Sequence, residues 1–323
     1  GGEYGVAKCD VNQMYGIEIE EFPSLIAQTA LWLTDHQMNR EFSKLSGHSF
    51  KRLPLLKSAN IHHANALTTP WESVIEPQKL NYVLGNPPFI GSKMMDNIQR
   101  EELLQYFDEK RGAGVLDYVC AWYAKTARTM ISKNHNIKAA FVSTNSISQG
   151  EQVAILWRAL FANDIKIDFA HKTFKWSNDA SGKAAVYCVI IGFSHKDNQK
   201  QKRIFDYPDI KGEPIEKVAK NINAYILDGP TVFIERHNKP LNDVPMMIEG
   251  ITALDKGGHL RMTESEMLEF IKQEPAAKQW VKPWITGQSY LNNEKLYCFW
   301  LAGISPTELK AMPKVMERVA KVK

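Results

Sequence analysis

The chain reads Asn86-Pro87-Pro88-Phe89 directly after an apolar run, 81–85, that is typical of a buried strand. The Asn86 side chain and the Pro87 carbonyl offer two oxygen acceptors at one strand end, and the two prolines remove backbone donors from this loop. Two acceptors can draw the protons of a flat, conjugated amino group, so that its nitrogen becomes tetrahedral and its lone pair attacks a methyl group. Phe89 offers a stacking face for the ring that carries the amine. The tetrapeptide therefore predicts methyl transfer to an aromatic amine, although on its own it equally suits the end of a core strand.

The elements that must position this loop alternate between strands and helices. Strands are predicted over 14–19, 60–67, 82–86, 138–144, 165–169 and 184–193, and helices over 22–38, 117–132 and 152–163. This alternation predicts an α/β fold with a parallel sheet. In such a sheet, ligands bind beyond the carboxyl ends of the strands, where residues from different strands meet.

Two further polar residues, Glu18 and Asn65, fall at predicted strand ends. An acid at the end of a second strand is the usual device for holding a pair of ribose hydroxyls, and Glu18 is placed for that role. Glu20 and Glu21 compete with it, but they fall at a helix start, where the helix dipole explains a carboxylate. The Asn65 side chain can accept from an adenine amino group while the Ala66 N–H donates to the ring. Taken alone, Asn65 is better explained as a turn residue.

Composition narrows the class of protein. The chain has 323 residues, of which 44% are hydrophobic, and is long enough for two domains. No apolar stretch is as long as a membrane span and no signal-peptide pattern is present, so we expect a cytoplasmic protein without a membrane partner. The four cysteines form no CxxC pair, which predicts no metal site and no disulfide framework, with Cys120 and Cys188 in the core. A net charge of +4 is compatible with a polyanionic partner but too small to demonstrate one.

Together, Glu18, Asn65 and the loop at 86–89 resemble motifs II, III and IV of the amino-group DNA methyltransferases that use S-adenosylmethionine. The likeness is closest to the adenine methyltransferase region of large single-chain restriction-modification enzymes of the MmeI kind. It is carried by YGIEIEEFPSLIAQTALWLTDHQMN (15–39) and NYVLGNPPFIGSKMM (81–95). LDYVCAWYAKTA (116–127), IKAAFVSTNSISQGEQV (137–153) and HKTFKWSNDASGKAAVYCVIIGF (171–193) resemble motifs V, VI and VIII. The blocks run in family order over 11–193, which chance agreement does not explain.

The resemblance implies methyl transfer from S-adenosylmethionine to the exocyclic amine of a flipped adenine in double-stranded DNA. The implied catalytic residues are Asn86, Pro87, Pro88 and Phe89, and the implied cofactor-binding residues are Glu18, Ile19, Asn65, Ala66 and Asn86.

The family also places an aromatic residue of motif VIII on the target base, opposite Phe89. In this chain that residue is Phe174 or Trp176, and we prefer Phe174 because it lies nearest the strand end. The neighbouring lysines, Lys172, Lys175 and Lys183, are candidates for contacts to DNA phosphates, although a solvated loop face explains them almost as well.

The composition changes at 195–202, a uniformly polar stretch, and we place the domain boundary there. The predicted architecture is a Rossmann-like methyltransferase domain over 1–195 and a smaller, partial target recognition domain over 203–323. PWITGQSYLNNEKLYCFWL (283–301) carries the clearest likeness to the start of the family's recognition domain, which would read base edges in the major groove.

One family element is absent from the sequence. Motif I, a glycine-rich loop of the kind Asp-Pro-x-Cys-Gly-x-Gly that follows the central first strand, should precede Tyr15. We therefore expect a fragment that lacks this strand, whose neighbours have unpaired edges, and whose binding of S-adenosylmethionine is weak or absent. The family's nuclease domain would lie upstream in a parent chain. Two alternatives remain open, a catalytically incompetent DNA-binding fragment and an amino-group methyltransferase that acts on RNA or protein.

Overall fold

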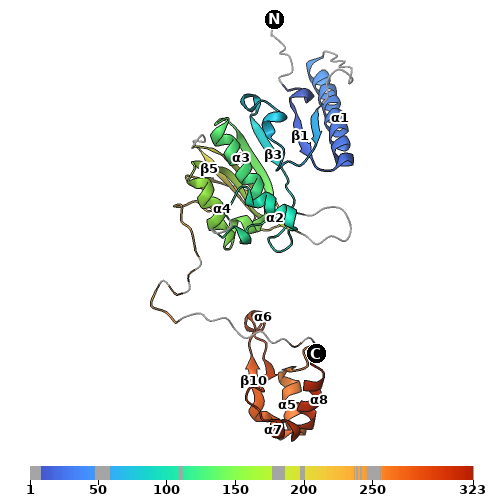
Figure 1. Cartoon of the computed structure of the whole chain (residues 1–323), viewed down its shortest axis with the longest axis vertical. Helices are drawn as coiled ribbons and strands as arrows, with labels where there is room; N and C mark the ends of the chain where they lie inside the picture. The colour runs from blue at the N-terminus through green and yellow to red at the C-terminus, as the bar shows by residue number, and fades with distance from the viewer. Residues whose placement is uncertain are drawn as a thin grey trace. The chain divides into compact units, whose positions relative to one another are not determined.

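The computed structural model describes residues 9–47, 59–108, 112–176, 186–196, 201–235, 237, 239–240, 242–245, 255 and 257–322. The chain forms two compact units, Gly1–Asn238 and Lys239–Lys323, whose elements are labelled in Figure 1. None of the helices within these ranges combines the length and the apolar character that crossing a membrane requires.

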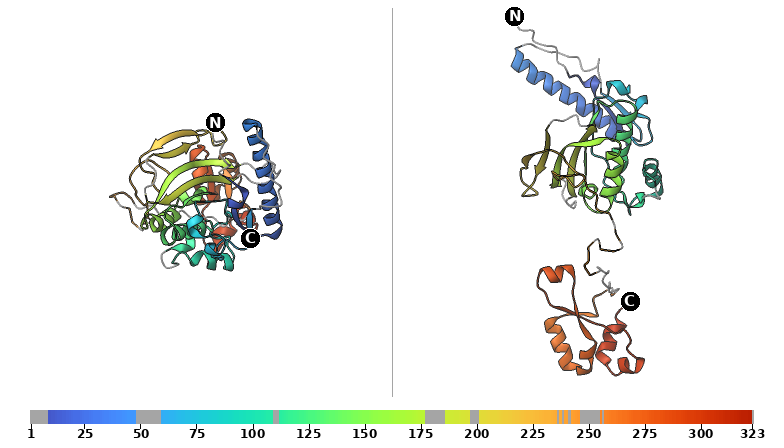
Figure 2. Two further views of the ribbon diagram at one scale, coloured as in Figure 1. Left: turned by 90° about the horizontal axis from the view of Figure 1, so that it is seen from above. Right: turned by 90° about the vertical axis from the view of Figure 1, so that its left-hand side faces the viewer.

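The described residues of the first unit form two separate sheets. In the smaller one, β1 (Tyr15–Glu18) pairs in parallel with β2 (Asn60–His63). The long helix α1 (Glu21–Ser46) packs against both strands, and Figure 2 shows it beside them and away from the other helices of the unit. α1 ends at Gly47, whose φ of 69° lies in the left-handed region that favours glycine.

The larger sheet has six strands in the order β3-β4-β6-β5-β7-β8. These strands are β3 (Tyr82–Gly85), β4 (Lys138–Thr144), β5 (Ile165–Trp176), β6 (Val186–His195), β7 (Lys202–Asp206) and β8 (Ile215–Ala219). The helices of the unit besides α1 are α2 (Asn97–Leu104), α3 (Cys120–Ser132) and α4 (Gln152–Phe161). Short 3-10 helices are η1 (Val11–Gln13), η3 (Trp71–Ser73), η4 (Pro77–Lys79), η6 (Ala113–Val115) and η7 (Asn145–Ser148).

The strand directions correct the expectation of a parallel sheet. β3 is parallel to β4 and β5 is parallel to β7, but β6 runs antiparallel to both of its neighbours and β8 runs antiparallel to β7. Only residues 177–185 separate β5 from β6. A parallel crossover needs a dozen residues or more, so the chain returns beside β5 in the opposite direction. The fold is therefore α/β with a mixed sheet.

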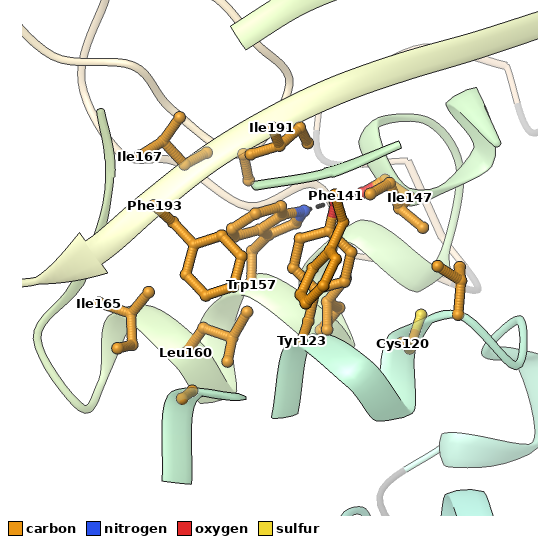
Figure 3. Close-up of a cluster of buried hydrophobic side chains, with 14 of the residues drawn as sticks. Cys120, Tyr123, Phe141, Ile147, Trp157, Leu160, Ile165, Ile167, Ile191 and Phe193 are labelled. Carbon is orange, nitrogen blue, oxygen red and sulfur yellow. Dashed lines mark hydrogen bonds between the residues drawn. The ribbon is translucent and has the colours of Figure 1, made fainter. Parts of the chain in front are cut away.

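One face of the six-stranded sheet is covered by α3 and α4, as Figure 1 shows. The ring of Tyr123, at the centre of this interface, lies 5.2 Å from that of Phe141, 5.7 Å from that of Trp157 and 5.2 Å from that of Phe193, between centroids. Figure 3 shows this cluster, in which the Trp157 indole donates to the Ile147 carbonyl over 2.8 Å. The buried position predicted for Cys120 and Cys188 is confirmed. These ring contacts pack α3 and α4 against β4 and β6.

The second unit has its own sheet and core. Its sheet has the order β10-β11-β9, with antiparallel neighbours. The elements are β9 (Arg261–Thr263), α5 (Glu264–Gln273), η8 (Pro275–Trp280), β10 (Val281–Trp284), α6 (Gly287–Leu291), β11 (Leu296–Phe299), α7 (Pro306–Lys310) and α8 (Pro313–Ala320). The buried core consists of Met262, Ala277, Phe299, Met312 and Val315.

The compact units divide between Asn238 and Lys239, whereas the boundary predicted from composition lies at 195–202. β7 and β8 add two strands to the edge of the large sheet, and the Lys202 ammonium donates to the Ile167 carbonyl of β5 over 3.0 Å. The segment after 203 therefore begins within the first unit, and the compact units meet at Asn238 and Lys239. His195 closes β6 and Lys202 opens β7, so the polar stretch at 195–202 falls between two strands of one sheet.

Candidate active site

A cavity of about 740 Å³ lies between the two sheets of the first unit. Every residue of β1 and of β3 lines it. Within the described ranges, β1 pairs only with β2 and β3 only with β4. Within these ranges each of the two strands has one edge without a ladder partner, and both strands border one cavity.

The residues predicted to bind the cofactor gather around this cavity. Its lining includes Glu18, Ile19, Asn65, Ala66 and Asn86, together with Pro87 and Pro88. These residues come from the ends of three strands, because Glu18 closes β1, Asn65 follows β2 and Asn86 follows β3. The remaining residue of the tetrapeptide, Phe89, is half-buried and is not part of the cavity wall.

The Asn86 loop presents two oxygens to which no described residue donates a hydrogen bond. Asn86 is exposed and Pro87 is buried. Within the described part of the chain, no group donates a hydrogen bond to Asn86 Oδ1 or to the Pro87 carbonyl oxygen. A side chain at Gly85 would bring its Cβ within 3.3 Å of the Phe141 ring, so glycine allows β3 to lie close to β4 just before this loop. The geometry leaves both acceptors available to a ligand.

Asp117 anchors the chain that follows this loop. Its Oδ1 accepts from the Ser92 N–H over 3.0 Å, and its Oδ2 accepts from Ser146 Oγ over 2.5 Å and from Gln152 Nε2 over 3.1 Å. The next residue, Tyr118, donates its N–H to the Ile90 carbonyl over 2.9 Å. Asp117 therefore ties the loop to η7 and α4. The sequence marked it only as the start of a helix.

Glu18 has the properties of an acceptor for hydroxyl groups. Its carboxylate accepts from the Glu20 N–H over 3.3 Å, and no lysine, arginine or histidine pairs with it among the residues that the structure describes. The turn beyond it is held by a 3.0 Å hydrogen bond between His63 Nε2 and the Ile19 carbonyl. An unpaired, half-buried carboxylate on a cavity wall can accept from two neighbouring O–H groups.

Asn65 forms the turn that the simpler interpretation expects. Its Oδ1 accepts from the Leu67 N–H over 2.8 Å, and its Nδ2 donates to Glu102 over 2.6 Å. No acceptor for the Ala66 N–H is found within the described ranges. The peptide donor therefore remains available to a ligand, whereas the side-chain oxygen is already used within the turn. The role of that oxygen in binding adenine stays a prediction.

Two family models match most of the chain. Residues 4–206 match the family described as MmeI, DNA-methyltransferase domain, and residues 228–323 match the family described as MmeI, target recognition domain. The chain belongs to the MmeI family.

Two proteins are similar to nearly the whole of this chain. DNA methyltransferase A of Bacillus subtilis (strain 168) is 37% identical over 327 residues, which cover 99% of this chain and 36% of that protein. The type IIL restriction-modification enzyme MmeI, whose structure was solved in complex with DNA, is 46% identical with a TM-score of 0.84, over 97% of this chain and 41% of that chain. The chain thus spans well under half the length of either relative.

The two motif VIII candidates for base stacking, Phe174 and Trp176, lie on a part of the large sheet away from the cavity. Phe174 stacks on Tyr207 at 5.2 Å between centroids, and Trp176 is 39% exposed. Both belong to β5, which β4 and β6 separate from β3, and neither lines the cavity. Their stacking on a base stays a prediction.

The three lysines of this region differ in what is known of their surroundings. Lys172 forms an ion pair of 3.5 Å with Asp206, and Lys175 is half-buried. Lys183 lies outside the described residues. Contacts from these lysines to phosphates also stay predictions.

Proposed function

We propose that the first unit transfers a methyl group from S-adenosylmethionine to the exocyclic amine of an adenine in double-stranded DNA. The observation that carries this proposal is a pair of acceptors, Asn86 Oδ1 and the Pro87 carbonyl, that receive no hydrogen bond from the described residues. Both residues line a cavity that Glu18 and Ala66 also line. Membership in the MmeI family supports the reaction type.

The free polar groups of the cavity suit this cofactor. The Glu18 carboxylate would accept from the two ribose hydroxyls, and the Ala66 N–H would donate to an adenine ring nitrogen. The side chain of Trp71 contributes an apolar wall nearby. When bound, the cofactor supplies a methyl group activated by its attachment to a positively charged sulfur.

The Asn86 loop would prepare the nucleophile. A conjugated amine is a poor nucleophile because its lone pair is delocalised into the ring. Asn86 Oδ1 and the Pro87 carbonyl would each accept one of its hydrogens, which concentrates the lone pair on nitrogen and offsets the positive charge that develops there. Phe89, with Phe174 or Trp176, would stack on the extruded base and offset the few kcal/mol that flipping costs.

The second unit would contribute to recognition of the DNA. It matches the target recognition domain of the MmeI family, and MmeI itself was solved in complex with DNA. Lys172, Lys175 and Lys183 would contact phosphates without reading sequence. A chromosomal substrate agrees with the predicted cytoplasmic location. The nuclease domain expected elsewhere in a parent chain remains a prediction.

The proposal is tested by a methylation assay in which the methylated product is identified. Because the chain spans less than half of its relatives, the assay uses the complete product of the reading frame that encodes it. Methyl-labelled S-adenosylmethionine is offered with duplex DNA, structured RNA or a release-factor-like protein, and the labelled products are digested and identified by mass spectrometry. We expect N6-methyladenine in the DNA. Label confined to RNA or protein, or no transfer at all, would contradict the proposal.

A further inference from the structure

Glu102 is a buried acid whose position the function described so far does not explain. It lies on α2, is 6% exposed and lines the cavity. No basic side chain pairs with it within the described ranges. Burying a carboxylate without a cationic partner is costly unless hydrogen bonds satisfy both oxygens. Oε1 accepts from Asn65 Nδ2 over 2.6 Å, and Oε2 accepts from the Tyr118 hydroxyl.

The Glu102 carboxylate determines how the Asn65 side chain is oriented. Because a carboxylate only accepts, the amide must turn its NH₂ towards Glu102 and its oxygen away from it. The oxygen then meets the Leu67 N–H at 2.8 Å and closes the turn around Ala66. Glu102 therefore selects one of the two amide orientations, and that orientation shapes the turn.

Lys125 holds the same turn from the other side. Its ammonium donates to the carbonyls of Ala66, Leu67 and Thr69 over 2.7, 2.9 and 2.6 Å. It also lies 5.2 Å from the centroid of the Trp71 ring, and the Trp71 indole donates to the Ala66 carbonyl over 3.0 Å. The carbonyls of the turn are thus engaged with Lys125 and Trp71, while the Ala66 N–H has no protein acceptor among the described residues.

We propose that Glu102 is a positioning residue for the nucleoside end of the cofactor. Through Asn65, and together with Lys125, it holds the turn at 65–69 so that the Ala66 N–H is directed at the ligand before the ligand arrives. This inference rests on the proposed function. It assigns α2 a part in cofactor affinity, separate from the activation of the amine by the Asn86 loop.

The proposal is tested with variants of the complete product of the reading frame. One of them exchanges the hydrogen-bond donor and acceptor between residues 65 and 102. Glu102→Leu removes the acceptor and Asn65→Asp sets two carboxylates against each other, so each should raise KM for S-adenosylmethionine about tenfold or more, with kcat and KM for DNA nearly unchanged. The double variant Asn65→Asp/Glu102→Gln restores the pair with donor and acceptor exchanged. In it, residue 65 still accepts from Leu67 and residue 102 still accepts from Tyr118, so it should recover most of the lost affinity.

A second measurement does not depend on methyltransferase activity. In the 323-residue chain, hydrogen–deuterium exchange at the Leu67 amide should be about tenfold faster or more in Glu102→Leu than in the wild type, with the amides of α3 unchanged as an internal control. Unchanged exchange at Leu67 would overturn the positioning role. So would an active enzyme whose cofactor KM is insensitive to Glu102→Leu, or a double variant no better than Asn65→Asp. If the wild-type enzyme transfers no methyl group, the proposed function is overturned instead. The hydrogen–deuterium exchange experiment then still decides whether Glu102 holds the turn.

Discussion

The backbone N–H of Ser92 donates a hydrogen bond to Oδ1 of Asp117 over 3.0 Å. Residues 25 positions apart are thereby joined just beyond the Asn86 loop. The other carboxylate oxygen accepts from Ser146 and Gln152. All of these contacts use Asp117 as an acceptor, so the loop depends on a carboxylate at this position.

Asp117→Asn should therefore loosen the loop without changing the volume of the side chain. An amide offers one oxygen where the carboxylate offers two, and at least one donor loses its partner, which costs about 1–3 kcal/mol. We expect that loss in urea unfolding and a lower kcat for methylation, with KM for S-adenosylmethionine nearly unchanged. Asp209→Asn, at an exposed turn, is the matched control. An Asp117→Asn enzyme with wild-type kcat would argue against this anchoring role.

Lys125 should make stability depend on pH. Burial lowers the pKa of its ammonium from the ordinary value of 10.5 to about 8. Between these values the unfolded chain holds the proton more tightly than the folded chain, so the free energy of unfolding rises with pH across this window. Below about 8 both states are protonated and above 10.5 neither is, so the contribution is constant outside the window.

Urea unfolding at about pH 7 and about pH 9.5 measures this effect. The stability of the wild type relative to Lys125→Met should be greater at the higher pH, and the subtraction removes the contribution of other titrating groups. Lys125→Arg keeps its charge throughout and should show no such rise relative to Lys125→Met. A wild type that loses stability relative to Lys125→Met as the pH rises would contradict the lowered pKa.

The sequence was sufficient for features that depend on local pattern. The strand ends that carry Glu18, Asn65 and Asn86 were predicted from apolar runs and from the family motifs, and these residues do line one cavity. The reversed direction of β6 and the membership of β7 and β8 in the large sheet depend on long-range pairing, which composition at 195–202 does not encode. The sequence therefore predicted which residues line the cavity, but not the strand pairing that follows residue 195.

The residues that hold the turn at 65–69, Glu102 and Lys125, were not predicted because they also act through long-range contacts. Asn65 and Glu102 are 37 positions apart, and Ala66 and Lys125 are 59 positions apart. Each of these side chains occupies an ordinary position in a helix or turn pattern. Only the packing of α2 and α3 beside the turn at 65–69 brings them together.

The cavity between β1 and β3 predicts weak cofactor binding by the 323-residue chain. Glu18 and Ala66 offer polar groups at one end, but along the strands the cavity wall consists of residues of β1 and β3, whose free edges lack ladder partners within the described ranges. Calorimetric titration with S-adenosylmethionine should give a Kd above about 100 μM. The complete product of the reading frame, titrated in parallel, should bind in the micromolar range. Micromolar binding by the 323-residue chain would show that its own residues suffice.

Base stacking can be assigned by fluorescence. With 2-aminopurine at the adenine that becomes methylated, extrusion of the base by the complete product should raise the emission. Loss of one stacking partner costs about 1–3 kcal/mol, so Phe89→Ala should greatly reduce the extruded fraction. Between the two motif VIII candidates, Phe174→Ala should reduce it and Trp176→Ala should not. The opposite order would transfer the role to Trp176.

In the proposed reaction Asn86 activates the amine, and the turnover of an Asn86→Ala enzyme is the sharpest test of that role. The measurement is single-turnover methylation of duplex DNA by the complete product, with Asn81→Ala, an exposed asparagine just before the same strand, as the control. We predict that Asn86→Ala slows methyl transfer by about 100-fold or more while DNA binding is retained, and that Asn81→Ala is unaffected. An Asn86→Ala enzyme that transfers methyl groups at a rate near that of the wild type would contradict it.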